Sequence, residues 1–206
     1  MTIRKPRSKG ADRRWRQRLI RYAADLHFAP NTIERFIELS EGSVVEEQDS
    51  FERRFERASP AEFEWLEDYA GDHAQELRDV TDLTYELAIL ALHKAVEISA
   101  RNMVGHAYPG FPLHKVFNAK QFTEELALRR FSLASTPRFR SFDELRCISN
   151  AIKHNGKVDA KLAAFGRWRF RKGKPLGNLK PHFERLLPLA RQYVAHLARR
   201  FSRQAS

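Results

Sequence analysis

Residues 80–104 form the most apolar stretch of the chain, and their apolar side chains have the spacing of a helix. Leucine, alanine and isoleucine recur there at steps of three and four residues, which places them on one side of an α-helix. We expect the buried stripe of this helix to consist of Leu83, Leu87, Leu90, Ala91 and Ile98. Signals for strand ends are scarce elsewhere. The sequence therefore predicts an all-α fold with residues 80–104 as a central element.

Three further helices are expected before this stretch. Apolar side chains at helical spacing predict one that ends near Pro30. Asn31 and Glu34 form the pattern of a capping box, and Gly42 is expected to end that short helix. A clearer start follows at Ser59-Pro60-Ala61-Glu62, which combines an N-cap serine, a proline at the first helical position and a glutamate at the third. The acidic middle of the chain is thus predicted to be helical.

Two more helices, separated by a loop, are expected in the C-terminal part. A capping box over residues 141–144 opens the first helix, and Asn155-Gly156 ends it. Apolar residues at helical spacing over 179–201 predict a long last helix. We expect the basic segment between them to be a loop with a short helix over 158–165 and a small hairpin over 166–177.

The net charge of +11 is unevenly distributed. Residues 1–21 carry nine Lys or Arg against one acid, residues 34–79 carry five against fifteen, and residues 101–206 carry 22 against six. A basic C-terminal half suits the binding of phosphates, and internal pairing of the opposite charges is the alternative. We expect residues 1–79 to be a helical N-terminal extension, with a basic leader and an acidic middle, and residues 80–206 to be the main helical domain.

Several classes of protein are disfavoured. The chain has no apolar run of roughly 18 residues, so we expect no membrane-spanning helix. The charged N-terminus lacks the apolar core of a secretory signal, which favours a cytoplasmic location. Cys147 is the single cysteine, which excludes an internal disulfide and disfavours a zinc cluster. We therefore expect neither a metal nor another cofactor.

A polar stripe is predicted on the helix that ends at residue 154. At about 100° per residue, Arg146, Asn150, Lys153 and His154 fall on one side. The other side holds Leu145, Ile148, Ala151 and Ile152. Metal-free RNA cleavage needs a group that titrates near neutral pH, which suits His154, and cations that hold the phosphate, which suits Arg146 or Lys153. The alternative is a solvated face whose terminal Lys153 and His154 complement the helix macrodipole.

The run Asp143-Glu-Leu-Arg146-Cys-Ile-Ser-Asn150-Ala-Ile-Lys153-His154-Asn-Gly156 resembles the signature helix of the HEPN superfamily, the higher eukaryotes and prokaryotes nucleotide-binding domains. In that family an arginine, often followed by a polar residue, precedes a histidine by a few positions. Seven residues separate Arg146 from His154, which is a longer gap than usual. Counting back from the histidine, Asn150 matches the family's asparagine, and Ser149 stands in the arginine's place.

More loosely, the resemblance extends over residues 80–206 and implies a HEPN-like helical bundle that forms a homodimer. Many members of the family cleave RNA without a metal, in toxin, phage-defence or RNA-processing settings. The resemblance therefore also implies this activity and a protein partner such as an antitoxin. The resemblance implies that His154 is the general acid–base and that Arg146 and Lys153 hold phosphate. Asn150 would orient the substrate or the histidine. The alternative is a non-catalytic HEPN-like module that binds nucleic acid or a protein partner through the same face.

A second candidate site interleaves cations with aromatic residues. It consists of Arg167, Trp168, Arg169, Phe170, Arg171 and Lys172. This pattern suits stacking on exposed RNA bases while the cations contact backbone phosphates. The alternative is that Trp168 and Phe170 anchor a loop on the core while the cations face water. RNA is the partner expected for both candidate sites.

Overall fold

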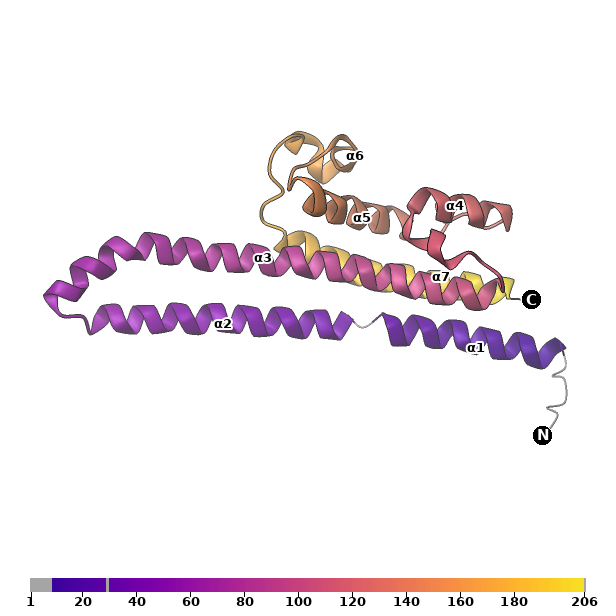
Figure 1. The fold of residues 1–206 in the computed structure, drawn as a ribbon, viewed down its shortest axis with the longest axis horizontal. Coiled ribbons are helices and arrows are strands. Elements are labelled where there is room, and N and C mark those ends of the chain that lie inside the picture. Colours follow the sequence, from indigo (N-terminus) through magenta and orange to yellow (C-terminus); the bar gives the residue numbers. More distant parts are fainter. Residues whose placement is uncertain (1–8, 29, 206) are drawn as a thin grey trace. The chain divides into compact units, whose positions relative to one another are not determined.

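The computed structural model describes residues 9–28 and 30–205, apart from the side chains of Lys9, Ala11, Leu26, His27 and Phe170. The elements are α1 (Lys9–His27), α2 (Pro30–Glu56), α3 (Pro60–Ala107), η1 (Leu113–Phe117), α4 (Ala119–Leu128), α5 (Phe139–His154), α6 (Ala160–Ala163), η2 (Gly166–Arg171) and α7 (Lys180–Gln204), where η marks a 3₁₀ helix (Figure 1). Within the described residues no strand occurs, and Lys157 and Pro175 form an isolated bridge. The predicted all-α fold is confirmed.

The chain forms two compact units, each assembled from separate segments. The first unit comprises the described residues up to Pro30 together with Leu92–Cys147 and the residues from Arg185 onward. The second comprises Asn31–Ala91 and Ile148–Glu184. Helices α3, α5 and α7 each contribute residues to both units. The division expected between residues 79 and 80 falls inside α3, which is continuous there.

Stacked aromatic rings form the centre of the first unit. Phe142 of α5 stacks on Tyr193 of α7 with ring centroids 4.7 Å apart, and Phe131 stacks on Phe201 at 4.6 Å. Tyr193 is buried, and this burial raises the pKa of its hydroxyl group. Stacked rings bury a large apolar area, so the Phe142–Tyr193 pair holds the first half of α5 against α7, and the Phe131–Phe201 pair holds the segment after α4 against the same helix.

The N-terminal end of α5 differs from the prediction. The helix begins at Phe139, after Arg138 in a positive-φ conformation, and the backbone N–H groups of Ser141 and Phe142 donate to the Arg138 carbonyl. Ser141 therefore lies inside the helix, and the expected capping box is wrong. The carboxylate of Glu144 instead accepts a hydrogen bond from Arg185 Nη2 at 2.6 Å. This largely buried ion pair joins α5 to α7 within the first unit.

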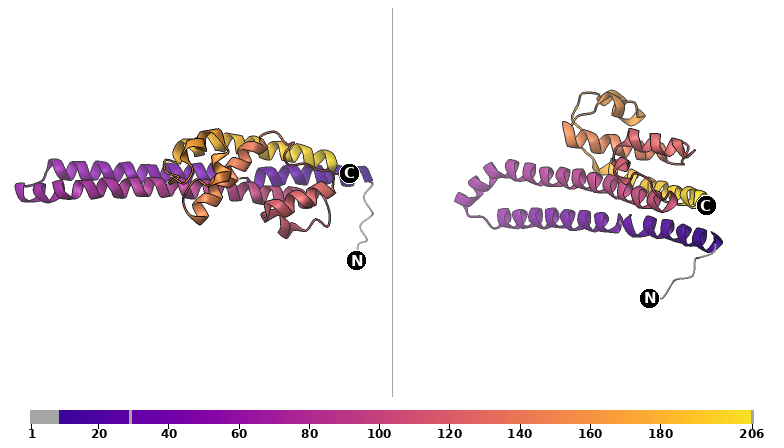
Figure 2. Two further views of the ribbon diagram at one scale, coloured as in Figure 1. Left: turned by 90° about the horizontal axis from the view of Figure 1, so that it is seen from above. Right: turned by 45° about the vertical axis from the view of Figure 1, so that its right-hand side comes forward.

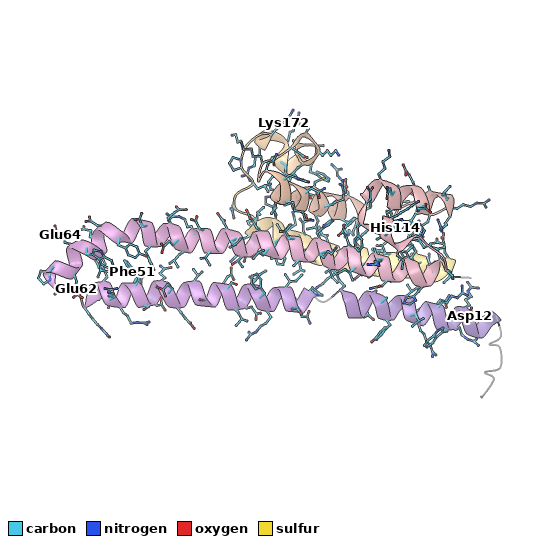
Figure 3. The ribbon with its side chains drawn as sticks, viewed as in Figure 1. Asp12, Phe51, Glu62, Glu64, His114 and Lys172 are labelled. Carbon is cyan, nitrogen blue, oxygen red and sulfur yellow. The ribbon has the colours of Figure 1, made fainter. Side chains whose placement is uncertain are left out.

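In the second unit, α2 and the part of α3 that precedes Leu92 run antiparallel (Figure 2). Phe51 stacks on His73 at 4.2 Å, and the rings of Phe55 and Phe63 are 4.7 Å apart. Figure 3 shows Phe51 between the two helices. Helix α2 continues through Gly42, so the expected helix end there is wrong. Packing of the later aromatic residues outweighs the roughly 1 kcal/mol that a glycine inside a helix costs.

The buried face of α3 also differs from the expected one. Leu83 and Leu87 are 54% and 45% exposed, whereas Tyr85, Ala88 and Ile89 are at most 2% exposed. Ala91 is exposed as well, and Leu90 and Ile98 are only half-buried, so the expected buried stripe is wrong. The spacing of apolar residues correctly indicated a helix, but α3 is apolar on more than one side. Its neighbours in the second unit cover the side that carries Tyr85.

The predicted start of α3 is confirmed. The helix begins at Pro60, and the Glu62 carboxylate accepts hydrogen bonds from the Ser59 backbone N–H at 3.2 Å and from the Ser59 hydroxyl at 3.0 Å. These two hydrogen bonds lower the pKa of Glu62. The Ser59 carbonyl accepts the first helical hydrogen bond from Phe63. The local sequence thus ends the α2–α3 turn and opens the next helix.

Ser59→Ala is expected to lower the free energy of unfolding by about 1 kcal/mol, because the N-terminus of α3 loses the hydrogen bond from the Ser59 hydroxyl to Glu62. Urea denaturation followed by circular dichroism measures this change. Ser50→Ala is the matched control, since Ser50 is exposed inside α2 and alanine is the better helix former there. Equal losses in the two variants would contradict a capping role for Ser59.

Three polar side chains join α2, α3 and α7 in the second unit. Glu41 Oε1 accepts hydrogen bonds from Lys180 Nζ at 2.6 Å and from the Tyr85 hydroxyl at 2.7 Å. These two donors, Lys180 foremost, lower the pKa of Glu41. Burial and the neighbouring Glu41 carboxylate raise the pKa of Tyr85 to about 12. The cluster fixes the first residue of α7, and with it the end of the basic loop that precedes this helix.

Candidate nucleic-acid interface

The C-terminal half of α5 turns its polar side chains toward solvent. Ile148 and Ala151 are buried, Asn150 is half-buried, and Lys153 and His154 are exposed. The helix is thus anchored by its apolar side, as the spacing predicted. Neither Lys153 nor His154 forms a side-chain hydrogen bond or ion pair with the described residues. Both are therefore accessible to a ligand.

Arg146 has a different environment from the rest of the predicted stripe. It lies in the first unit, and its guanidinium donates to Asp143 Oδ1 at 2.6 and 2.9 Å and to Cys147 Sγ at 3.7 Å. Asp143 is one turn toward the start of α5, whereas His154 is about 12 Å further along the helix in the other direction. The structure does not bring Arg146 to His154. Arg146 is therefore separate from the cations near the histidine.

Gly156 ends α5 and turns the chain. Its φ of 61° suits glycine, and its N–H donates to the Ala151 carbonyl at 2.8 Å. Three backbone hydrogen bonds of 2.8 to 3.0 Å then join Leu176 N to Gly156 O, Val158 N to Lys174 O, and Gly173 N to Val158 O. The segment after α5 is therefore paired with residues 173–176. The expected hairpin over 166–177 is wrong, because Gly166–Arg171 form η2, whereas the expected short helix is present as α6.

This pairing gathers the end of α5, α6 and η2 into one small structure, which we call the cationic lobe and define as residues 153–174. The lobe contains eight Lys or Arg and a single acid, Asp159. Its exposed cations are Lys153, Lys157, Lys161, Arg167, Arg169, Lys172 and Lys174. The Asp159 carboxylate accepts a hydrogen bond from Leu162 N at 2.7 Å and so caps α6. Figure 3 shows Lys172 at the outer edge of the lobe.

Trp168 anchors the lobe from inside. It is fully buried, and its ring stacks on His182 with centroids 4.1 Å apart. The Arg171 guanidinium lies 5.3 Å from the same ring and donates to the carbonyls of Pro175 and Leu176 at 3.0 and 2.5 Å. In this structure the indole is a packing group, not a platform for a base. The side chain of Phe170 lies outside the described residues.

The lobe unites the two candidate sites that the sequence suggested separately. Lys153 and His154 come from the first site, and Arg167, Arg169 and Lys172 come from the second. Motif reasoning missed three cations between and after them: Lys157, Lys161 and Lys174. The sequence did indicate these cations, but only through the high content of Lys and Arg in the loop. Only the pairing of residues 156–158 with 173–176 shows that these cations share one structure.

Comparison of the chain with protein-family models, with curated proteins and with solved structures finds no significant match. In the described part of the chain, no three His, Cys, Asp or Glu side chains lie close enough together to hold a metal ion. A search of the same residues finds no helix both long and apolar enough to span a membrane. The chemistry of the lobe is therefore the basis for assigning a function.

Proposed function

We propose that the protein binds RNA through the cationic lobe, as a HEPN-like RNA-targeting protein of the cytoplasm. The observation that carries this proposal is the seven exposed Lys and Arg side chains within residues 153–174. The single acid of the lobe is engaged as an N-cap, so it offsets little of this charge. Such a surface binds phosphate backbones because each contact releases condensed counterions.

The side chains beside these cations support RNA as the polyanion. Asn150 and His154 provide an amide and an imidazole next to the Lys153 ammonium group. Amide and imidazole groups can hydrogen-bond to a 2′-hydroxyl group, which RNA has and DNA lacks.

The test is the salt dependence of RNA binding. Fluorescence anisotropy with a short single-stranded RNA should give a plot of log K against log salt with a slope of about −3 or steeper, which corresponds to four or more phosphate contacts. Binding that does not weaken with salt would contradict the proposal. If polyglutamate of the same length competes as well as the RNA does, the lobe is a surface for acidic proteins instead.

RNA cleavage without a metal is the second candidate function, favoured by the exposure of His154 within the lobe. The imidazole can take the proton of a 2′-hydroxyl as its oxygen attacks phosphorus, and an imidazolium can protonate the leaving 5′-oxygen. Lys153 would stabilise the charge that develops on the phosphate. A homodimer would supply the second histidine, as the HEPN resemblance implies. The toxin or phage-defence setting, with an antitoxin partner, belongs to this candidate.

A further inference from the structure

An open pocket of about 510 Å³ lies between α1 and α7 in the first unit. Gln17 Nε2 donates to the Ser202 carbonyl at 3.0 Å and joins the two helices at the pocket. Three small residues, Ala24, Ala195 and Ala198, provide its apolar part. The volume is in the range of small-molecule sites and exceeds that of a single inorganic ion. None of the lining residues belongs to the cationic lobe.

Three guanidinium groups surround this pocket. Arg21 comes from α1, and Arg199 and Arg203 come from α7; all three are exposed. Asp25 is the acid among the lining residues, so the pocket carries a net charge of about +2 when Arg and Asp have their usual charges. Arg199 Nε donates to the Ala195 carbonyl at 3.2 Å, which leaves the other N–H groups of its guanidinium for a ligand.

A histidine on α7 responds to one of these cations, Arg199. The pKa of His196 on α7 is lowered by burial and by the positive charges of Arg199 and Arg138. Like charges near an imidazole disfavour its protonated form. The effect of Arg199 on His196 is consistent with the net positive charge of the residues that line the pocket.

Ser202 supplies a polar group at the pocket itself. The residue is 7% exposed, and its Oγ is buried without a hydrogen-bond partner among the described residues. Buried hydroxyl groups are normally paired, because an unpaired one loses its hydrogen bonds to water on folding. Ser202 is one of the residues that line the pocket, so rotation of its side chain can bring Oγ to an oxyanion there, beside the guanidinium groups of Arg199 and Arg203.

We propose that this pocket binds a phosphate monoester. Arg21, Arg199 and Arg203 would hold its oxygens, Ser202 Oγ would donate a hydrogen bond, and the alanines would contact the organic part. A phosphate monoester carries a charge of about −1.5 to −2 at pH 7, which matches the charge of the pocket, whereas a backbone phosphodiester carries only one negative charge. The ligand is either a small phosphorylated molecule or the phosphorylated end of an RNA.

Isothermal titration of the full chain with inorganic phosphate, at constant ionic strength, tests the site. Combined Arg199→Gln and Arg203→Gln should weaken binding by about tenfold or more, and Ser202→Ala should weaken it by a smaller factor without any change of charge. The matched control is Arg18→Gln, because Arg18 is an exposed arginine of α1 that does not line the pocket. Circular dichroism melting checks that each variant folds.

The outcomes separate the site from general attraction of anions. The proposal is overturned if the protein does not bind phosphate or if neither pocket variant weakens the binding. It is also overturned if Arg18→Gln weakens the binding as much as the pocket variants do. To identify the source, RNAs with a 5′-phosphate and a 5′-hydroxyl are compared on a chain carrying Arg167→Gln, Lys172→Gln and Lys174→Gln. A preference for the 5′-phosphate that Ser202→Ala reduces indicates an RNA end, whereas phosphate binding without that preference indicates a small molecule. Neither result depends on RNA binding by the lobe.

Discussion

Replacing Arg167, Lys172 and Lys174 together with glutamine is expected to weaken RNA binding by about a hundredfold near 0.1 M salt. Each phosphate contact to single-stranded RNA contributes roughly 0.7 to the slope of log K against log salt. Loss of three contacts therefore makes the slope less steep by about 2. At this salt concentration the change corresponds to a binding constant weaker by about two orders of magnitude. The three side chains are exposed in the lobe, so the substitutions leave the Trp168 anchor in place. Anisotropy titrations over a salt series measure both quantities.

The matched control removes the same charge from the other part of the second unit. Arg53 on α2, Arg57 in the turn after it and Arg78 on α3 are exposed, and the surrounding sequence is acidic. Their combined replacement by glutamine is expected to change RNA affinity by less than about threefold, through long-range attraction alone. If both triple variants lose affinity equally, net charge explains the binding and the lobe is not the interface.

His154→Ala is expected to slow RNA cleavage by about 10²–10⁴-fold in EDTA, if the protein cleaves RNA, because the reaction loses its general acid–base. RNA affinity should change little, since the cations of the lobe remain. Gel analysis of a mixed RNA substrate measures the rate, and anisotropy measures the affinity. The control is His114→Ala, which removes another exposed histidine, on η1.

The outcomes of this comparison assign the protein to one of the two classes. Cleavage that survives His154→Ala excludes this imidazole as the catalyst. RNA binding without cleavage by the unmodified protein identifies a binding module, which would fit the engagement of Arg146 by Asp143 at 2.6 Å. Cleavage lost equally in the His114→Ala control would point to a general effect of substitution instead of chemistry at His154.

Local signals in the sequence predicted those features that depend on local interactions. Ser59 and Pro60 start α3 as expected, because a cap uses side chains within one turn of the helix. Leu145, Ile148 and Ala151 on the apolar side of α5 are also buried as expected, and Ile152 is half-buried. The helical class followed from the same periodicity.

Features that depend on distant segments could not be predicted in this way. Gly42 lies within α2 because residues that follow it pack against α3. Leu83 and Leu87 are exposed because other helices cover a different side of α3. The lobe depends on hydrogen bonds between residues 156–158 and 173–176, and no local sequence motif predicts these bonds. Its seven exposed cations were visible in the sequence as charge but not as one surface.

The burial of Trp168 gives the protein an internal optical reporter. The chain has three tryptophans, and Trp15 and Trp65 are 46% and 51% exposed, whereas Trp168 is fully buried. Acrylamide in solution therefore quenches the emission of the first two much more readily. The emission that remains comes mainly from the indole inside the lobe, stacked on His182. Opening of the lobe can thus be followed by fluorescence without any added label.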